Sequence, residues 1–465
     1  MGPKRTAPGV HPPRVGRQRF PARTTFPRHR VRGAEDGPEE AGMYAVTHNR
    51  VARMLERTLV AALLATGLVL VIIMHRNRPQ GLLLSELGGY IKPTWQAPAG
   101  TKRISNLLRS KDWSADFIET YLWIRADERV AELSRAEKPV LVIWDESVIE
   151  KPESLHGEGL CAVRSSKARR LKRIKPGFFN PPSGRPIFVP GYNWLQVLVA
   201  GMEGSPVVAK MQWWTTRGEQ ATDKRSLEAE ILREIAEKWG SQVVHIWDRG
   251  FAGAPWLSLA YVHAVRFVMR WPKRYGLIHD LGEERPAWQF TRGKRSWEYR
   301  LLWDARRRCY RKTGILAVPV YDKLHHQPLW LVVARPGSGR EPWYLLTNEP
   351  IRNSQDAWNV VLAYARRWQI EMSIRFDKCE LAFESPRLRH WESQRRLLLI
   401  TTLVFAFLIS LLTLQPLLNW LLTYWCHRTG KWSLKVKTPL YRLRSALSRL
   451  WLSHPPPFLH RLTSG

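Results

Sequence analysis

The hydrophobic positions between residues 139 and 271 form short runs that are typical of β-strands, separated by segments with helical spacing. Residues 219–239 place apolar side chains on one helical face, and a short helix is predicted at 251–263. The predicted order is strand, strand, strand, helix, strand, helix, strand, which indicates an α/β fold. The strand runs are VLVIW (140–144), NWLQVLVAG (193–201), PVVAKMQWW (206–214), VVHIW (243–247) and AVRFVMRW (264–271).

The pattern changes after residue 271. Residues 271–350 are rich in Trp, Tyr and Arg and contain alternating runs such as WEYRLLW, ILAVPVY and PLWLVVA, which predict an antiparallel β segment. One long helix is expected over about 355–381, and 397–426 carries no formal charge. A basic amphipathic helix is expected at 440–452.

The N-terminal part is different in composition. Residues 1–34 hold nine Lys or Arg, six Pro and no acid, so a disordered basic tail is predicted over 1–42. Short amphipathic helices with basic faces follow, and 43–130 is predicted to be a small helical DNA-binding domain. Translation from Met1 and translation from Met43 both fit this pattern.

Charge indicates the class of partner. The chain has 73 Lys and Arg against 40 Asp and Glu, a net charge of +33, which favours nucleic acid first and an anionic membrane surface second. Its four cysteines contain no CxxC pair, so a zinc ribbon or a disulfide framework is not expected and a reducing compartment fits.

Three acids are placed where chemistry is expected. Asp145 and Asp248 each follow a predicted strand that ends in Ile-Trp, and carboxylates at strand ends project from a rigid edge. On a continuous helix, the spacing of Tyr364, Arg367, Glu371 and Lys378 places all four on one face. Three carboxylates suit divalent metal ions, and the cations suit phosphates. Turn-forming aspartates and a solvated, ion-paired helix face are the structural alternative.

These residues resemble the motifs of DDE transposases of the insertion-sequence-four type. Tyr364, Arg367, Glu371 and Lys378 match the family's Y-R-E-K signature, Asp248-Arg249-Gly250-Phe251 is similar to its second-aspartate motif, and Asp145-Glu146-Ser147 resembles its first. The resemblance covers about 130–415. It implies a ribonuclease-H-like catalytic core with an inserted antiparallel β segment, preceded by the N-terminal helical DNA-binding domain.

The resemblance also implies a division of the chain. The implied segments are the tail (1–42), a helical domain that binds transposon ends (43–130), the first part of the core (131–270), the β insertion (271–350), the second part of the core (351–426) and a basic C-terminal helical segment (427–465).

The family's site residues transfer to matching positions. Asp145, Asp248 and Glu371 would bind Mg²⁺ or Mn²⁺, with two ions expected, and Tyr364, Arg367, Lys378 and Arg249 would contact DNA. Trp343 would stack on a base flipped from the duplex, with a core-packed strand Trp as the alternative. Glu146 departs from the family motif and is expected to crowd the metal site.

The resemblance implies further partners and a location. Double-stranded DNA, as terminal inverted repeats and as target, is the expected partner of a homodimer in the bacterial cytoplasm, bound to the nucleoid. A hairpin DNA intermediate is left open. One alternative is a non-catalytic DNA-binding remnant on the same fold. Another is a membrane-associated protein with spans near 58–74 and 397–426, which the polar gaps in the second stretch disfavour.

Overall fold

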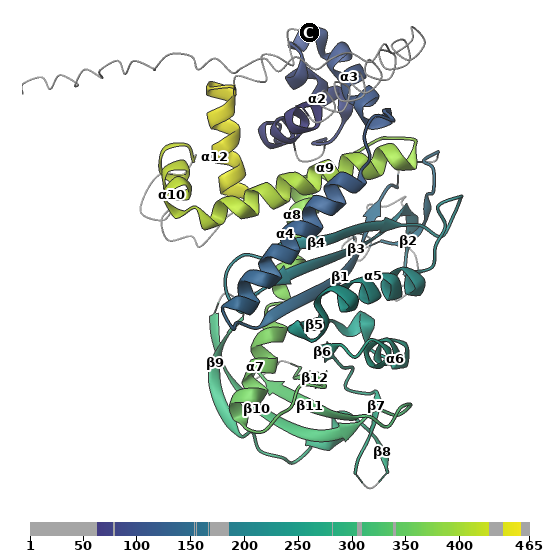
Figure 1. Ribbon diagram of the computed structural model, residues 1–465, viewed down its shortest axis with the longest axis vertical. Helices are drawn as coiled ribbons and strands as arrows, with labels where there is room; N and C mark the ends of the chain where they lie inside the picture. Colours follow the sequence, from purple (N-terminus) through teal and green to yellow (C-terminus); the bar gives the residue numbers. More distant parts are fainter. Residues whose placement is uncertain are drawn as a thin grey trace, which may run out of the picture. The chain divides into compact units, whose positions relative to one another are not determined.

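The described part of the chain is a mixed α/β fold built on one large sheet (Figure 1). The computed structural model describes residues 63–77, 80–152, 154, 156–165, 167, 186–280, 282–304, 309–337, 341–426 and 440–456. The predicted basic tail, the start of the predicted helical domain and most of the C-terminal segment outside its helix lie outside these residues.

The sheet has twelve strands in the order β2-β3-β1-β5-β6-β12-β11-β10-β7-β8, with β4 beside β3 and β9 beside β10. Strands β1, β5 and β6 are parallel neighbours, whereas β3 pairs with β1 in antiparallel orientation. The strands are β1 (Val140–Glu150), β2 (Cys161–Arg164), β3 (Phe188–Ala200), β4 (Val207–Trp214), β5 (Val243–Trp247), β6 (Arg266–Arg270), β7 (Gly276–Ile278), β8 (Glu284–Pro286), β9 (Glu298–Asp304), β10 (Cys309–Tyr321), β11 (Pro328–Arg335) and β12 (Trp343–Thr347).

Two features of the sheet differ from the sequence predictions. The first strand does not end before Asp145 but continues to Glu150, since residues 145–150 remain paired with residues 191–196 of β3. The short strand β2 was not predicted. The six strands from β7 to β12 continue the same sheet through the antiparallel pair β12–β6. Whether they form a separate insertion stays a prediction.

Helices cover both faces of the sheet because side chains alternate along each strand. Leu141 and Ile143 enter one hydrophobic layer, with α7, α8 and α9, while Val142 and Trp144 enter the other, with α5 and α6. The helices are α2 (Leu84–Ile91), α3 (Ala97–Arg109), α4 (Asp116–Arg135), α5 (Lys224–Trp239), α6 (Ala254–Val262), α7 (Ser354–Ala365), α8 (Trp368–Cys379), α9 (Trp391–Ser410), α10 (Gln415–Tyr424) and α12 (Leu440–Ser453), with an apolar helix at Leu63–Met74.

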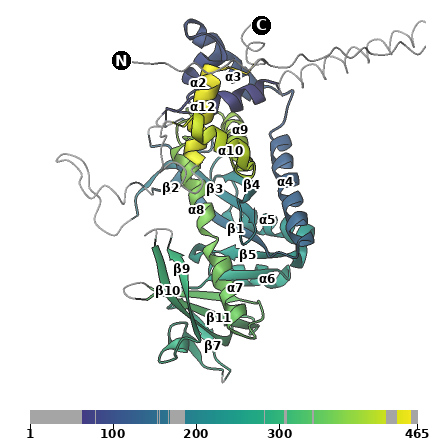
Figure 2. The same ribbon diagram turned by 90° about the vertical axis from the view of Figure 1, so that its left-hand side faces the viewer.

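The expectation of one helix over 355–381 was wrong. A turn at Arg366 and Arg367 separates α7 from α8, and Figure 2 shows the two helices following one another along the sheet. The side chain of Arg366 donates hydrogen bonds to the carbonyls of Gly201 and Gly204, which fixes this turn against the β3–β4 connection.

The uncharged stretch 397–426 also contains a break. It comprises most of α9, a 3-10 turn at Leu411–Thr413 and α10. Within the described residues, one helical segment, Trp391–Thr413, is long and apolar enough to cross a membrane, but 67% of its most apolar window is buried inside the fold. The other stretch considered as a span is described only as the shorter apolar helix Leu63–Met74.

The C-terminal helix α12 binds the apolar helix Leu63–Met74 through backbone carbonyls. Arg444 is buried and donates hydrogen bonds to the carbonyls of Ile72, His75 and Glu380, while Ser448 donates to that of Met74 at 2.7 Å. The last carbonyls of a helix have no partner within it, so Arg444 satisfies groups at the ends of both the apolar helix and α8.

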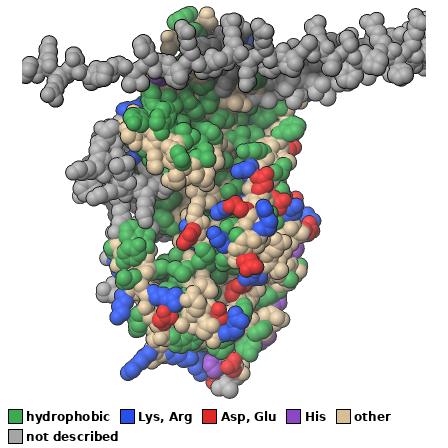
Figure 3. Space-filling model, turned by 60° about the vertical axis from the view of Figure 1, so that its left-hand side comes forward, with side chains coloured by type: hydrophobic (Ala, Val, Ile, Leu, Met, Phe, Trp, Pro, Cys, Tyr) green, Lys and Arg blue, Asp and Glu red, His purple; other side chains and the backbone are tan. Residues whose placement is uncertain are grey.

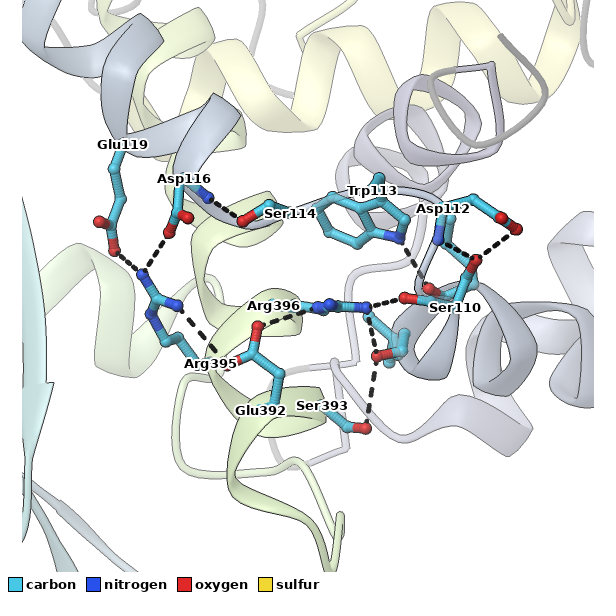
Figure 4. Close-up of polar contacts among 12 residues, drawn as sticks. Ser110, Asp112, Trp113, Ser114, Asp116, Glu119, Glu392, Ser393, Arg395 and Arg396 are labelled. Atoms are coloured by element: carbon cyan, nitrogen blue, oxygen red, sulfur yellow. Dashed lines mark hydrogen bonds and ion pairs between the residues drawn. The ribbon is translucent and has the colours of Figure 1, made fainter. Parts of the chain in front are cut away.

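Two consecutive arginines on α9 hold the connection between α3 and α4 (Figure 4). Arg396 donates to the carbonyls of Leu108 and Ser110 and lies 4.9 Å from the centroid of the Trp113 ring. Arg395 forms ion pairs with acids in the first turn of α4, Asp116 at 3.1 Å and Glu119 at 2.7 Å. These contacts attach the N-terminal helices to the helix that covers the sheet.

Candidate functional site

Strand register brings the two predicted aspartates to the same level of the sheet. Ile143 of β1 is aligned with Ile246 of the parallel strand β5. Asp145 and Asp248 each lie two residues further along, so both are displaced equally from this pair and share its face. Asp248 directly follows β5, and its side chain accepts a hydrogen bond from the backbone of Gly250 at 2.6 Å.

Helix α8 brings the third acid, Glu371, to the same face. Asp145 is aligned across β1 and β3 with Gln196, whose amide donates to the hydroxyl of Ser373 at 2.7 Å. Gln196 and Ser373 are buried, so this bond fixes α8 at the level of Asp145. Sequence reasoning did not identify Gln196. The lone amide inside the apolar run NWLQVLVAG is the signal that could have identified it.

Arg367 lies between two of the three carboxylates. One guanidinium nitrogen is 3.2 Å from Oδ2 of Asp145, and the other pairs with Oε1 of Glu371. Although burial opposes the charge on Arg367, the nearby acidic groups, Tyr364, Asp145 and Glu371 among them, hold its pKa above the usual value.

The electrostatics of Asp145 show that the three acids influence one another. The pKa of Asp145 is raised to about 7, chiefly by burial, against the opposing charge of Arg367 and with a further contribution from the charges of Asp248 and Glu371. The Asp145 side chain is only 15% exposed. The charge of Arg367 therefore does not offset the combined effect of burial and the two neighbouring carboxylates on the pKa of Asp145.

Tyr364 and Trp343 meet beside Arg367. Their rings are in edge contact with centroids 5.2 Å apart, and the guanidinium of Arg270 lies 6.0 Å from each. Tyr364 is buried, and Trp343 is partly buried against the core. The structure brings these two predicted DNA-binding residues together, next to the acids. Arg270 is a further cation of this cluster that the sequence reasoning missed.

Lys378 and Arg249 have other partners. Lys378 pairs with Glu384 at 3.7 Å, and burial lowers the pKa of its amine. Lys167 also pairs with Glu384, at 2.5 Å. Arg249 forms an ion pair with Glu341 at 2.7 Å, although it directly follows Asp248 in the chain. These two cations thus pair outside the carboxylate group, and their contact with DNA stays a prediction.

The expectation that Glu146 crowds the metal site was wrong. Consecutive strand residues point to opposite faces, so Glu146 lies on the α5 side of the sheet, away from Asp145. There it pairs with Lys224 at 2.5 Å, next to the buried Glu228. Burial and the charge of Glu146 raise the pKa of Glu228 to about 8.

Asp145, Asp248 and Glu371 are not arranged as a metal coordination shell in this structure. Among the residues that the structure describes, no group of three or more His, Cys, Asp or Glu is arranged to hold a metal ion. Arg367 takes up an oxygen of Asp145 and an oxygen of Glu371, which a shared cation would otherwise contact. The arrangement is an ion pair of Arg367 with Asp145 and Glu371, with Asp248 near enough to raise the pKa of Asp145.

Comparison with known proteins adds little. No protein-family model matches the sequence, and no curated protein matches it. Among solved structures, the chain is similar to one titled "Cryo-EM structure of piggyBac transposase synaptic complex with hairpin DNA (SNHP)", with a TM-score of 0.32 and 14% sequence identity. That match covers 70% of this chain and 57% of the other.

Proposed function

We propose that this chain is a metal-dependent DNA transposase of the DDE type, and that it resembles the insertion-sequence-four group. The observation that carries the proposal is the convergence of Asp145, Asp248 and Glu371. They come from two aligned parallel strands and a helix anchored across them. Carboxylates from three segments, with the pKa of Asp145 raised, fit a phosphodiester-cleaving site better than a structural ion pair, which needs only one acid for each cation.

The donor set suits a hard divalent cation such as Mg²⁺ or Mn²⁺. Carboxylate oxygens are the ligands that such ions prefer, and negative charge in excess of Arg367 favours their binding. Asp145, Asp248 and Glu371 would hold the metal, with two ions expected from the family resemblance. When bound, the metal would stabilise the charge that develops on the attacking and leaving oxygens during phosphodiester cleavage.

Arg367 has a defined part in this proposal. It holds Asp145 and Glu371 in the absence of a cation, so metal binding requires it to release at least one of their oxygens. The freed guanidinium is suited to a DNA phosphate, which accepts paired hydrogen bonds from arginine. Tyr364 and Arg270 border the same position and would orient this guanidinium.

The proposed reaction has two steps. Water attacks the phosphorus at the end of the element, the bond to the leaving oxygen breaks, and a 3′-hydroxyl is freed. That hydroxyl then attacks a phosphorus of target DNA and displaces a second oxygen. Terminal repeats and target DNA are the proposed partners, bound by a homodimer in the bacterial cytoplasm. The net charge of +33 supports a polyanionic partner and predicts strongly salt-dependent binding.

The test compares wild type with Glu371→Gln, which removes a charge and keeps the side-chain size. The substrate is DNA carrying the sequences that flank the coding region on both sides, with Mg²⁺ or Mn²⁺. Glu230→Gln, at an exposed glutamate of α5, is the matched control. We expect wild type and Glu230→Gln to cleave, and Glu371→Gln to bind DNA equally without cleaving. Cleavage by Glu371→Gln at the wild-type rate would refute the assignment.

A second function is a non-catalytic DNA-binding protein on the same fold. The ion pairs of Arg367 favour it, because they satisfy Asp145 and Glu371 without a metal. Calorimetric titration with Mn²⁺ separates the two functions without knowledge of the DNA ends. Binding by wild type that is weakened in Glu371→Gln supports the enzyme. Absence of Mn²⁺ binding together with DNA binding supports the non-catalytic protein.

A further inference from the structure

The ribbon formed by β9 and β10 carries a row of large hydrophobic side chains on its outer face. Every second residue from 297 to 303 is large and apolar or aromatic: Trp297, Tyr299, Leu301 and Trp303. Their exposed fractions lie between 49% and 69%. Across the ribbon, Trp303 is aligned with Tyr310 and Leu301 with Lys312, so these side chains share the same face.

The opposite face of the ribbon packs against the core and α7. Packing within the fold therefore does not explain the row of hydrophobic side chains on the outer face. Leu302 packs against the core, and the guanidinium of Arg300 lies 5.2 Å from the centroid of the Trp358 ring on α7. Arg300 also donates to Gln355 of α7 at 2.9 Å. Because one face is already packed, the other would normally carry polar residues. An exposed row of this size indicates an interaction surface.

The rings of the outer face are held in place by their neighbours. Trp303 and Tyr310 are in edge contact, with ring centroids 5.1 Å apart. Tyr299 lies over Gly314, where an added Cβ would come within 2.6 Å of the Tyr299 ring. The amine of Lys312 lies 5.0 Å from the centroid of that ring. The face is therefore partly preorganised, which lowers the entropy cost of binding.

The charges of the ribbon are distributed unevenly between its faces. Its two acids lie on the packed side and both pair with arginine: Glu298 with Arg300 at 2.6 Å and Asp304 with Arg311 at 2.9 Å. Among the described residues 297–304 and 309–312, Lys312 is the single ionised side chain on the outer face. Figure 3 shows hydrophobic side chains over the lower part of this view, interspersed with Lys and Arg and with some Asp and Glu side chains.

We propose that this outer face binds unpaired DNA bases by stacking. Aromatic rings in a row with a cation beside them are the elements that hold single strands, because every base has a π-face and every nucleotide a phosphate. A hydrophobic protein partner needs the rings but not the cation. The lack of a carboxylate on the face and the net charge of +33 favour the polyanion.

This inference goes beyond the proposed reaction and does not depend on Asp145, Asp248 or Glu371. Single-strand binding by the ribbon requires neither metal nor cleavage. If stacking fails while cleavage depends on Glu371, only the inference is wrong. If Glu371→Gln cleaves normally while the ribbon binds bases, only the catalytic assignment is wrong.

The test measures binding of a single-stranded oligo-dT labelled with a fluorophore to the full chain by anisotropy, without divalent metal. We expect Trp303→Ala and Tyr310→Ala each to weaken binding about tenfold, and Trp303→Phe to retain most of the affinity, because a ring remains. Tyr424→Ala, at a tyrosine of α10 that is 72% exposed and lies outside both the ribbon and the predicted DNA-binding domain, is the matched control and should bind like wild type.

An abasic strand of the same length separates stacking from charge. Since it has phosphates but no bases, wild type and Trp303→Ala should bind it equally. Equal loss on both strands, or oligo-dT binding unchanged in both alanine variants, would overturn the inference. So would an altered oligomeric state in Trp303→Ala at unchanged oligo-dT affinity, because it would assign the face to a second copy of the chain. Thermal unfolding confirms that each variant is folded.

Discussion

Replacing Asp145 with Asn tests whether this carboxyl is held in an unfavourable charged state. Its pKa is about 7 in the fold, whereas an ordinary aspartate has a value near 3.8. An acid with a raised pKa stabilises the fold while it is protonated, so its contribution is complete below about pH 4. The contribution declines as pH rises and is gone above about pH 7.

The size of the effect follows from the two pKa values. Between pH 5 and pH 7 the unfolded chain has released this proton and the folded chain has not. Two pH units at about 1.4 kcal/mol each give a loss of about 3 kcal/mol in the free energy of unfolding. Asn does not ionise, so Asp145→Asn should lack this loss. The side chain is 15% exposed, which makes the figure an upper estimate.

The assay is urea unfolding of both proteins with a chelator at pH 5 and at pH 8. Lys151 and Glu228 also titrate in this range, so the useful quantity is the difference between wild type and Asp145→Asn. Asp280→Asn, at an exposed aspartate, should follow wild type. Excess Mg²⁺ at pH 8 should restore stability to wild type and to Asp280→Asn, but not to Asp145→Asn. A difference below about 1 kcal/mol, or one of opposite sign, would refute this account of Asp145.

Two further substitutions test the contacts that join distant helices. Arg444→Met should lower the free energy of unfolding by about 3 kcal/mol, because two buried carbonyls and one part-buried carbonyl lose their donor. Denaturant unfolding measures this change, and a change within error would mean that water satisfies those carbonyls. Arg396→Met should lower the free energy of unfolding by about 1–2 kcal/mol and speed hydrogen exchange of the backbone amides at residues 108–113. Unchanged amide exchange there would contradict the role of Arg396 in holding the α3–α4 connection.

Hydrophobic periodicity was sufficient to predict most strands and the alternation of strands with helices, but not where each element ends. The apolar run at 140–144 stops at Asp145, yet β1 continues because its backbone still pairs with β3. Backbone pairing does not require apolar side chains. Similarly, no Gly or Pro marks the turn at Arg366, which the carbonyls of Gly201 and Gly204 select from a distant part of the chain.

The candidate site was only partly predictable for the same reason. The residue types of Asp145, Asp248 and Glu371 indicated an acidic site, and strand alternation would have placed Glu146 on the opposite face had β1 been extended correctly. The pairing of Arg367 with two of the acids depends on the turn between α7 and α8. Local spacing describes one helix face and cannot describe two helices joined at an angle.

The contact between α12 and the apolar helix Leu63–Met74 has a consequence for the newly made chain. At about 5–20 residues per second, the ribosome needs roughly 20 to 70 s to pass from residue 74 to residue 440. During that time Ile72 and His75 lack Arg444 as the donor to their carbonyls. The apolar helix Leu63–Met74 therefore lacks its contact with α12 until residue 440 has been added. Chaperones and proteases would have access to this helix during that time.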